Sequence, residues 1–209
     1  MGLIPCLVAG CGPGSADLVT PQVRAAVRNL ELLAGTPRLL ALFPECRAER
    51  LGYDHSLAEF LDRLAPHLGR RATGVLVSGD PGLASLAGTL ARRFPDIPFR
   101  RLPGISSLQL AFAEAGLDWQ EARILRGHGS LPAWDPAWDR DPGPVALLAG
   151  APGVPAFAAD LALRLGRGHI WRCERLGLPG QTVTRLSPAA LAAEGCDPLS
   201  ILILEGVNP

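Results

Sequence analysis

Residues 74–90 read GVLVSGDPGLASLAGTL, and this stretch indicates the fold class more directly than any other part of the chain. It begins with an apolar run of strand length, residues 74–78, which stops at the turn sequence Gly79-Asp80-Pro81-Gly82. Apolar residues then recur at helical spacing, at Leu83, Leu86, Ala87 and Leu90. We therefore predict a buried strand, a turn and a helix in succession.

The same succession occurs on either side of this stretch. Residues 3–9 are an apolar run that ends at Gly10-Cys11-Gly12-Pro13-Gly14, and residues 99–102 end at Pro103-Gly104-Ile105-Ser106-Ser107. Repeated strand–helix units predict a mostly parallel sheet, in which the carboxyl ends of the strands lie along one edge. Ligands bind at that edge in such folds, so the three turns predict a small-molecule site.

The pattern changes in the second half of the chain. Residues 127–144 are rich in Gly, Pro, Trp and Asp and show no periodicity. Beyond them we predict strands at residues 145–149, 170–174, 181–185 and 199–204, and helices near 155–165 and 188–194. The predicted fold class is therefore α/β, with two α/β domains, residues 1–118 and 119–209, that share an interface and a site.

Composition excludes several classes of function. The 20 basic residues balance 20 acidic ones, which argues against a nucleic-acid-binding surface because such a surface needs an excess of positive charge. Every basic residue is Arg, so there is no P-loop, Schiff-base or general-base lysine. The five cysteines form no CxxC pair, which predicts reduced thiols, a cytoplasmic protein and no metal site. No apolar run is long enough to cross a membrane.

Two of the turns allow more than one interpretation. The Gly10–Gly14 turn superficially matches a dinucleotide fingerprint, but that motif needs Gly at the position of Ser15. Asp80 at a strand end would accept hydrogen bonds from ribose hydroxyls or an amine, or it would cap the helix that follows. Ser106 and Ser107 would either cap their helix or line the same site.

These motifs together resemble the tetrapyrrole methyltransferase superfamily. The resemblance is carried by the GxGPG turn, the GDPG turn and the segment PGISSLQLAFAEAGLDW at residues 103–119. Within the superfamily the chain looks most like the branch that methylates carbon 5 of a precorrin in cobalamin biosynthesis. The features shared with that branch are the 103–119 segment, His128-Gly129 and the Glu174-Arg175-Leu176-Gly177 run.

The resemblance implies a cofactor, an architecture and a set of site residues. Members bind S-adenosylmethionine in the cleft between two α/β domains and usually form homodimers. The implied cofactor-binding residues are Pro13, Gly79, Asp80, Leu83, Ser106, Ser107, Leu148 and Gly177. The implied substrate-binding residues are Gly12, Arg126, His128 and Glu174.

The implied reaction is methyl transfer to carbon 5 of precorrin-7 or cobalt-precorrin-7, or of precorrin-6B if the chain is part of a fused enzyme. His128 is the candidate general base because an imidazole titrates near neutral pH, although it would serve equally well as a structural hydrogen-bonding group. Arg126 would bind a substrate carboxylate, since the branch usually has Arg where this chain has Ser130. A C-15 methyltransferase domain or subunit is an expected partner.

Two other functions remain open at this point. The chain could methylate another position of a tetrapyrrole ring, as relatives in the superfamily do. It could instead be a non-catalytic tetrapyrrole-binding scaffold for a C-15 methyltransferase partner. Binding of S-adenosylhomocysteine separates an enzyme from a scaffold, because a scaffold has no use for a cofactor site.

Overall fold

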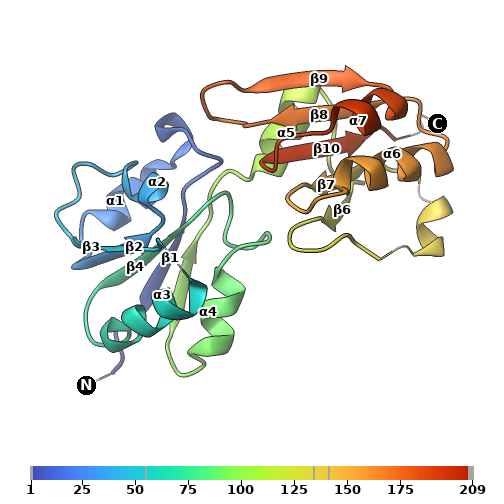
Figure 1. Cartoon of the computed structure of the whole chain (residues 1–209). Coiled ribbons are helices and arrows are strands. Elements are labelled where there is room, and N and C mark those ends of the chain that lie inside the picture. Colours follow the sequence, from blue (N-terminus) through green and yellow to red (C-terminus); the bar gives the residue numbers. More distant parts are fainter. Residues whose placement is uncertain (1, 55, 134, 141, 207–209) are drawn as a thin grey trace. The chain divides into compact units, whose positions relative to one another are not determined.

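The computed structural model describes residues 2–54, 56–133, 135–140 and 142–206, and these form two compact units (Figure 1). One unit ends at Ser106 and the other begins at Ser107, which is earlier in the chain than the predicted boundary after residue 118. The reason is that helix α5 (Ser107–Ala115) packs on strand β10 (Ser200–Leu204) of the second unit. The Cys173 thiol also lies 3.9 Å from the carbonyl oxygen of Ala111 in this helix.

The first unit is built on a parallel sheet, as predicted. Its strand order is β3-β2-β4-β1-β5, and every described pair is parallel. The strands are β1 (Cys6–Gly10), β2 (Leu32–Gly35), β3 (Glu49–Gly52), β4 (Thr73–Val77) and β5 (Phe99–Leu102). Because β4 and β5 flank β1, the turns that follow these three strands lie at one edge of the sheet.

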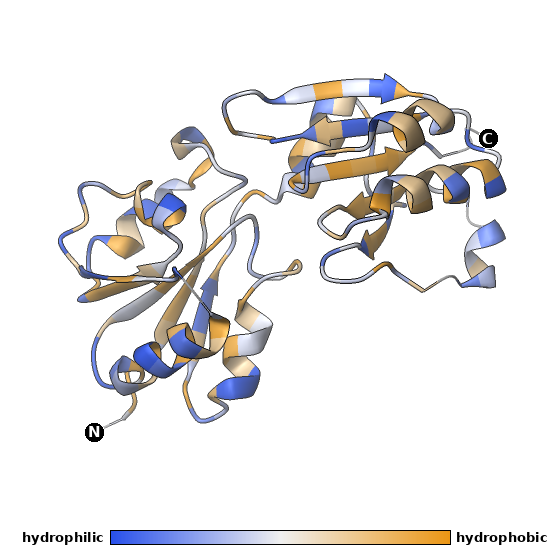
Figure 2. Cartoon of the chain, in the orientation of Figure 1, coloured by the Kyte–Doolittle hydropathy of each residue, from blue (hydrophilic) through white to orange (hydrophobic). Residues whose placement is uncertain are grey.

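Helices cover both faces of this sheet. They are α1 (Pro21–Val27), α2 (Pro37–Leu40), α3 (Leu57–Leu64) and α4 (Ala87–Arg93), with 3₁₀ turns at Ala16–Leu18 and Ala65–His67. Along β1, Leu7 and Ala9 pack in the core with α1 and α2, whereas Cys6 and Val8 pack in the core with α3 and α4. Successive strand side chains point to opposite faces, so one strand serves two apolar layers. Strands β1, β2 and β4 accordingly consist mainly of apolar residues, whereas β3 and β5 also carry charged ones (Figure 2).

Capping side chains precede the first turns of α1 and α3. Thr20 accepts a hydrogen bond from the amide of Val23 at the start of α1, and Ser56 accepts one from Glu59 at the start of α3. The prediction that a helix begins directly after Pro81 is wrong, because α4 begins only at Ala87. Residues 81–86 form turns and bends instead, so Leu83 lies outside any helix.

The second unit contains a mixed sheet of strand order β6-β7-β10-β8-β9. Its strands besides β10 are β6 (Arg123–Arg126), β7 (Val145–Leu148), β8 (Ile170–Glu174) and β9 (Thr182–Leu186). The β6–β7 pair is parallel, and the other described pairs are antiparallel. Helices α6 (Val154–Arg164) and α7 (Pro188–Glu194) share a core with this sheet, and Pro136–Arg140 is a 3₁₀ turn.

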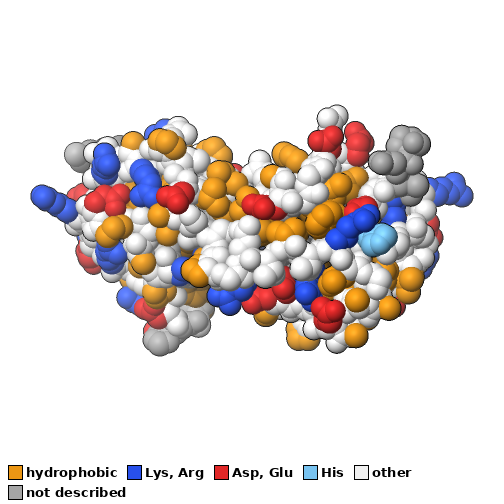
Figure 3. Space-filling model, turned by 90° about the horizontal axis from the view of Figure 1, so that it is seen from above, with side chains coloured by type: hydrophobic (Ala, Val, Ile, Leu, Met, Phe, Trp, Pro, Cys, Tyr) orange, Lys and Arg blue, Asp and Glu red, His pale blue; other side chains and the backbone are white. Residues whose placement is uncertain are grey.

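The surface agrees with the balanced composition. Acidic and basic side chains are interspersed on the face of the molecule that Figure 3 shows. Among the helices that the structure describes, none combines the length and the apolar character needed to cross a membrane.

Candidate active site

Two of the predicted turns are hydrogen-bonded to each other in the first unit. The amide of Gly79 donates to the carbonyl oxygen of Gly12 at 2.8 Å, and the amide of Gly12 donates to that of Gly79 at 3.3 Å. The amide of Cys11 also donates to Val77 at 2.9 Å. The GxGPG and GDPG turns therefore continue the pairing of β1 with β4 beyond the ends of the strands.

Close packing of glycines joins the third turn to these two. A Cβ atom on Gly10 would lie 2.6 Å from the amide nitrogen of Gly104 and 2.7 Å from the carbonyl oxygen of Gly79. A Cβ atom on Gly104 would in turn overlap backbone atoms of Gly79 and Gly10. Any side chain at Gly10 or Gly104 would thus push the turns apart. We call Gly10, Gly79 and Gly104 the glycine junction.

The Asp80 carboxylate ties the junction together from one side. It accepts a hydrogen bond from the amide of Gly82 at 2.7 Å and another from the amide of Gly104 at 3.2 Å. It does not cap α4, where the Ser85 hydroxyl instead accepts from the amide of Ala87 at 3.2 Å. The hydrogen bonds of Asp80 therefore link the turn after β4 to the turn after β5.

The remaining predicted residues of the first unit line or support these turns. Gly12 and Pro13 are buried, and the Arg38 guanidinium donates to the Pro13 carbonyl oxygen at 3.4 Å. Gly12 has a φ of +73°, and a Cβ there would lie 2.8 Å from the carbonyl oxygen of Leu18, so the turn requires glycine. Leu83 is half-buried and Ser106 is buried. Ser107 begins α5 and belongs to the second unit.

In the second unit, Arg126 and His128 lie at the carboxyl end of β6, which pairs in parallel with β7. Arg126 is the last residue of β6 and pairs with Leu148 at the end of β7. The amide of Gly127 donates to the carbonyl oxygen of Leu148 at 2.9 Å, which extends the pairing by one residue. Arg126 and His128 are therefore two residues apart at the same strand end, and both side chains are exposed.

The imidazole of His128 lies against the backbone of Gly150, the second residue after β7. A Cβ atom on Gly150 would overlap His128 Nδ1 and would lie 2.9 Å from its Cε1. Desolvation by burial lowers the pKa of His128 below its ordinary value, and the positive charge of Arg126 lowers it further. The neutral imidazole, which can accept a proton, is therefore the favoured form at neutral pH.

The Glu174 carboxylate forms hydrogen bonds and an ion pair with neighbouring residues. Its carboxylate accepts hydrogen bonds from the amide of Asp197 at 2.8 Å and from the Thr182 hydroxyl at 3.2 Å. Arg172 forms an ion pair with it at 3.4 Å. These contacts tie β8 to β9 and to the segment before β10, so the carboxylate has a structural role at this strand end.

Leu148 and Gly177 occupy the same end of the second sheet. Leu148 is the buried last residue of β7, and its carbonyl oxygen is bound by Gly127. Gly177 lies in the connection between β8 and β9 with a φ of +69°. Its amide donates to the Gln181 side chain at 2.8 Å. Both residues thus offer mainly backbone groups to their surroundings.

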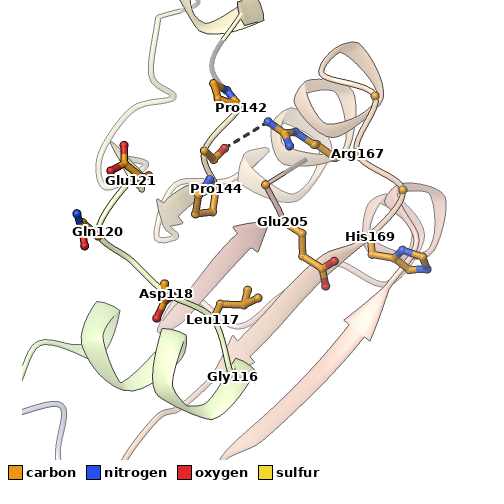
Figure 4. Close-up of a pocket in the computed structure, with 14 residues that line it drawn as sticks. Gly116, Leu117, Asp118, Gln120, Glu121, Pro142, Pro144, Arg167, His169 and Glu205 are labelled. Atoms are coloured by element: carbon orange, nitrogen blue, oxygen red, sulfur yellow. Dashed lines mark hydrogen bonds between the residues drawn. The ribbon is translucent and has the colours of Figure 1, made fainter. Parts of the chain in front are cut away.

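A cavity of about 1240 Å³ lies elsewhere in the second unit (Figure 4). It is lined by Leu117, Asp118, Arg167, His169 and Glu205 among others, and by none of the predicted site residues. These residues border the starts of β6 and β8 and the end of β10, the opposite end of the sheet from His128.

Two charged groups of this cavity, Glu205 and Arg167, form hydrogen bonds with the surrounding protein. Glu205 accepts from the Trp171 indole at 2.6 Å and from the Arg185 guanidinium at 2.7 and 2.8 Å, and this pairing lowers the pKa of Glu205. Arg167 donates to the Gly143 carbonyl oxygen at 3.3 Å. The cavity is therefore not the site that the sequence predicted.

Gly10 and Gly104 are not among the site residues predicted from the sequence. Both belong to the predicted turns, and their role depends on packing between turns rather than on contact with a ligand. The signal available in the sequence was that a glycine lies at or just after the end of each of these neighbouring parallel strands. Within the described part of the chain, no group of three or more His, Cys, Asp or Glu side chains is placed to hold a metal ion.

Known proteins resemble this chain along most of its length. Residues 5–192 match the family model described as Tetrapyrrole (Corrin/Porphyrin) Methylases. The chain is 30% identical over 164 residues to the cobalt-precorrin-7 C(5)-methyltransferase of Salmonella typhimurium, a match that covers 78% of this chain and 79% of that protein.

A longer relative and a solved structure extend the comparison. The chain is 30% identical over 207 residues to the decarboxylating precorrin-6Y C(5,15)-methyltransferase of a Sinorhizobium species, covering 95% of this chain but 46% of that protein. The uroporphyrin-III C-methyl transferase of Thermus thermophilus, solved with S-adenosylhomocysteine, has a TM-score of 0.76 at 22% identity. That match covers 97% of this chain and 92% of the other, and it shows a shared fold.

Proposed function

The chain belongs to the tetrapyrrole (corrin/porphyrin) methylase family, and we propose that it transfers a methyl group from S-adenosylmethionine to carbon 5 of a precorrin. The observation that carries the proposal is the 30% identity to a cobalt-precorrin-7 C(5)-methyltransferase, joined to an intact junction of three turns at the edge of a parallel sheet. Precorrin-7 and cobalt-precorrin-7 are the proposed substrates, with precorrin-6B if a further domain is fused.

The residues at the junction fit the proposed cofactor. The half-buried Asp80 carboxylate accepts one hydrogen bond at each oxygen, and a carboxylate offers about four acceptor positions. Positions therefore remain for the ribose hydroxyls or the ammonium of S-adenosylmethionine. When bound, that cofactor supplies an electrophilic methyl group on sulfur. The proposed cofactor-binding residues are Pro13, Gly79, Asp80, Leu83, Ser106 and Ser107, with Leu148 and Gly177 from the second sheet.

His128 and Arg126 are the proposed substrate-handling side chains. His128 Nδ1 is the ring nitrogen next to Gly150, so Nε2 on the far edge of the ring is left to accept a proton from the methylated macrocycle. The Arg126 guanidinium, two residues before it, is proposed to bind a substrate carboxylate in bidentate fashion. Gly12 is proposed to contact the substrate through its backbone. Glu174 is proposed to shape the substrate site through the loops that it holds.

Further proposals concern assembly and location. We propose that the enzyme forms a homodimer. We also propose that it acts in the cytoplasm, which is consistent with the free thiols of all five cysteines. We also propose that it works with a C-15 methyltransferase domain or subunit, because the decarboxylating relative is about twice as long as the matched region.

Methyl transfer from ¹³C-labelled S-adenosylmethionine tests the proposed function. The purified chain is incubated with cobalt-precorrin-7 or precorrin-7, and the position of the labelled methyl group is determined by NMR. Label at carbon 5 supports the proposal. Label at another ring carbon would replace it with a different tetrapyrrole methylation. Tetrapyrrole binding with no transfer to either substrate would favour the scaffold function instead.

A further inference from the structure

The contact between His128 and Gly150 depends on the absence of a side chain at residue 150. A Cβ atom there would overlap His128 Nδ1 and come within 2.9 Å of Cε1 and 3.1 Å of Cγ. These three atoms make up one edge of the imidazole. The Nδ1 edge of the ring therefore lies against the backbone of Gly150.

The backbone on both sides of this contact is held by hydrogen bonds. The amide of Gly127 donates to the Leu148 carbonyl oxygen at 2.9 Å, and the amide of Ala151 donates to the Gly127 carbonyl oxygen at 2.7 Å. Gly127 is itself confined, because a Cβ there would lie 2.8 Å from the Leu148 oxygen and 2.8 Å from a methyl group of Val154. The residues that flank the His128 ring thus have little freedom to move relative to one another.

The same arrangement controls the charge of the imidazole. Contact with Gly150 removes water from one edge of the ring, and both this desolvation and the charge of Arg126 favour the neutral form. Arg126 is the charged group whose field acts on His128 among the described residues. A substitution that displaced the ring from Gly150 would expose it to water and remove the desolvation.

We propose that Gly150 is the positioning residue for His128, holding the imidazole so that Nε2 faces the substrate side and remains free of protein contacts from this loop. The inference rests on the proposed role of His128 as the proton acceptor. It assigns to Gly150 an effect on turnover that operates through the histidine and not through direct contact with substrate or cofactor.

Gly150→Ala in the full chain tests this assignment. The pKa of His128 is measured by NMR in wild type and variant, and we expect it to rise toward the ordinary imidazole value when the ring is displaced. We expect kcat to fall about tenfold or more while the KM for S-adenosylmethionine changes little. Gly168→Ala is the matched control, because a Cβ at Gly168 meets nothing within 4 Å, and it should leave both quantities unchanged.

Backbone strain is separated from ring displacement by a second variant. Gly150 has a φ of +153°, which disfavours alanine, so Gly150→Ala is also made in a His128→Ala background. The strain is the same in both backgrounds, and we expect no further loss of kcat when His128 is already absent. An equal loss in both backgrounds, with an unchanged His128 pKa in the single variant, would overturn the inference.

A measurement on the wild-type protein covers the case in which the variant does not fold. A nuclear Overhauser effect between the His128 Hε1 and Gly150 Hα protons is expected from the close contact, and its absence would contradict the inference. Failure of the proposed function looks different. A folded wild-type chain that transfers no methyl group would remove that function, while the contact and the pKa shift of His128 would still be observed.

Discussion

At the scale of single residues, the first role of the Asp80 carboxylate is to hold turns of the first unit together. Its carboxylate accepts hydrogen bonds from the amides of Gly82 and Gly104, which lie in two different turns. We predict that Asp80→Ala lowers the free energy of unfolding of the first unit by about 1–3 kcal/mol. Urea denaturation measures this loss. Asp96→Ala removes an exposed carboxylate of the same unit and should change stability by less than about 0.5 kcal/mol.

His128 gives the protein a pH dependence of known sign. Because its pKa is lowered in the folded state, the unfolded chain takes up the proton first as the pH falls. The neutral imidazole therefore does not lower the free energy of unfolding above about pH 6.5. As the pH drops below that value, the folded state loses stability. We predict that His128→Gln removes this part of the acid sensitivity. Unfolding midpoints are measured between pH 7.5 and 5 for both proteins, and midpoints that fall in parallel as the pH drops would show that the histidine is not responsible.

At the scale of elements, the glycine junction decides whether three strand ends can meet. We predict that Gly104→Ala destabilises the first unit by about 1–3 kcal/mol, because its Cβ would collide with backbone atoms of Gly79 and Gly10. Gly88→Ala in α4 is the control with the opposite sign. Its Cβ would meet only the flexible end of Arg92 at 3.4 Å, and it should stabilise by roughly 0.5–1 kcal/mol. Thermal unfolding of the two variants distinguishes backbone collision from a general effect of alanine.

The strands that sequence reasoning missed share one physical property. Both β3 and β6 lie at the edges of their sheets. Glu49 and Arg50 in β3 are exposed, as are Ile124 and Arg126 in β6. Edge strands carry charge that prevents pairing with other chains, and this charge hides the apolar pattern by which buried strands are found. The central strands β1, β4, β7 and β10 are fully buried and were predicted within two or three residues at their ends.

At the scale of the whole molecule, the boundary between units could not be read from local patterns. The periodic pattern of the first half is lost at residues 127–144, which led to the predicted boundary after residue 118. The partner that places α5 in the second unit is β10, far away in the sequence, and no local periodicity reports that contact. The turns of the site could be predicted because each follows its strand directly. The glycine junction and the contact of His128 with Gly150 arise between segments and needed the fold.

The position of α5 has a consequence for fragments of the chain. We predict that residues 107–209 fold on their own, with cooperative unfolding and native-like circular dichroism. Residues 119–209 lack α5 and leave the β10 face that it covers exposed to water, so this fragment should aggregate or unfold at lower temperature. Equal stability of the two fragments would mean that α5 contributes nothing to the second unit.

Binding of S-adenosylhomocysteine, measured by calorimetric titration, tests the central claim most directly. The account predicts a Kd near micromolar for the folded wild-type chain. Asp80→Ala should weaken it at least about tenfold, or about 1.4 kcal/mol, while Asp96→Ala leaves it unchanged. Circular dichroism confirms that each variant is folded before titration. No detectable binding by the folded wild type would contradict the account, and equal binding by both variants would remove Asp80 from the cofactor site.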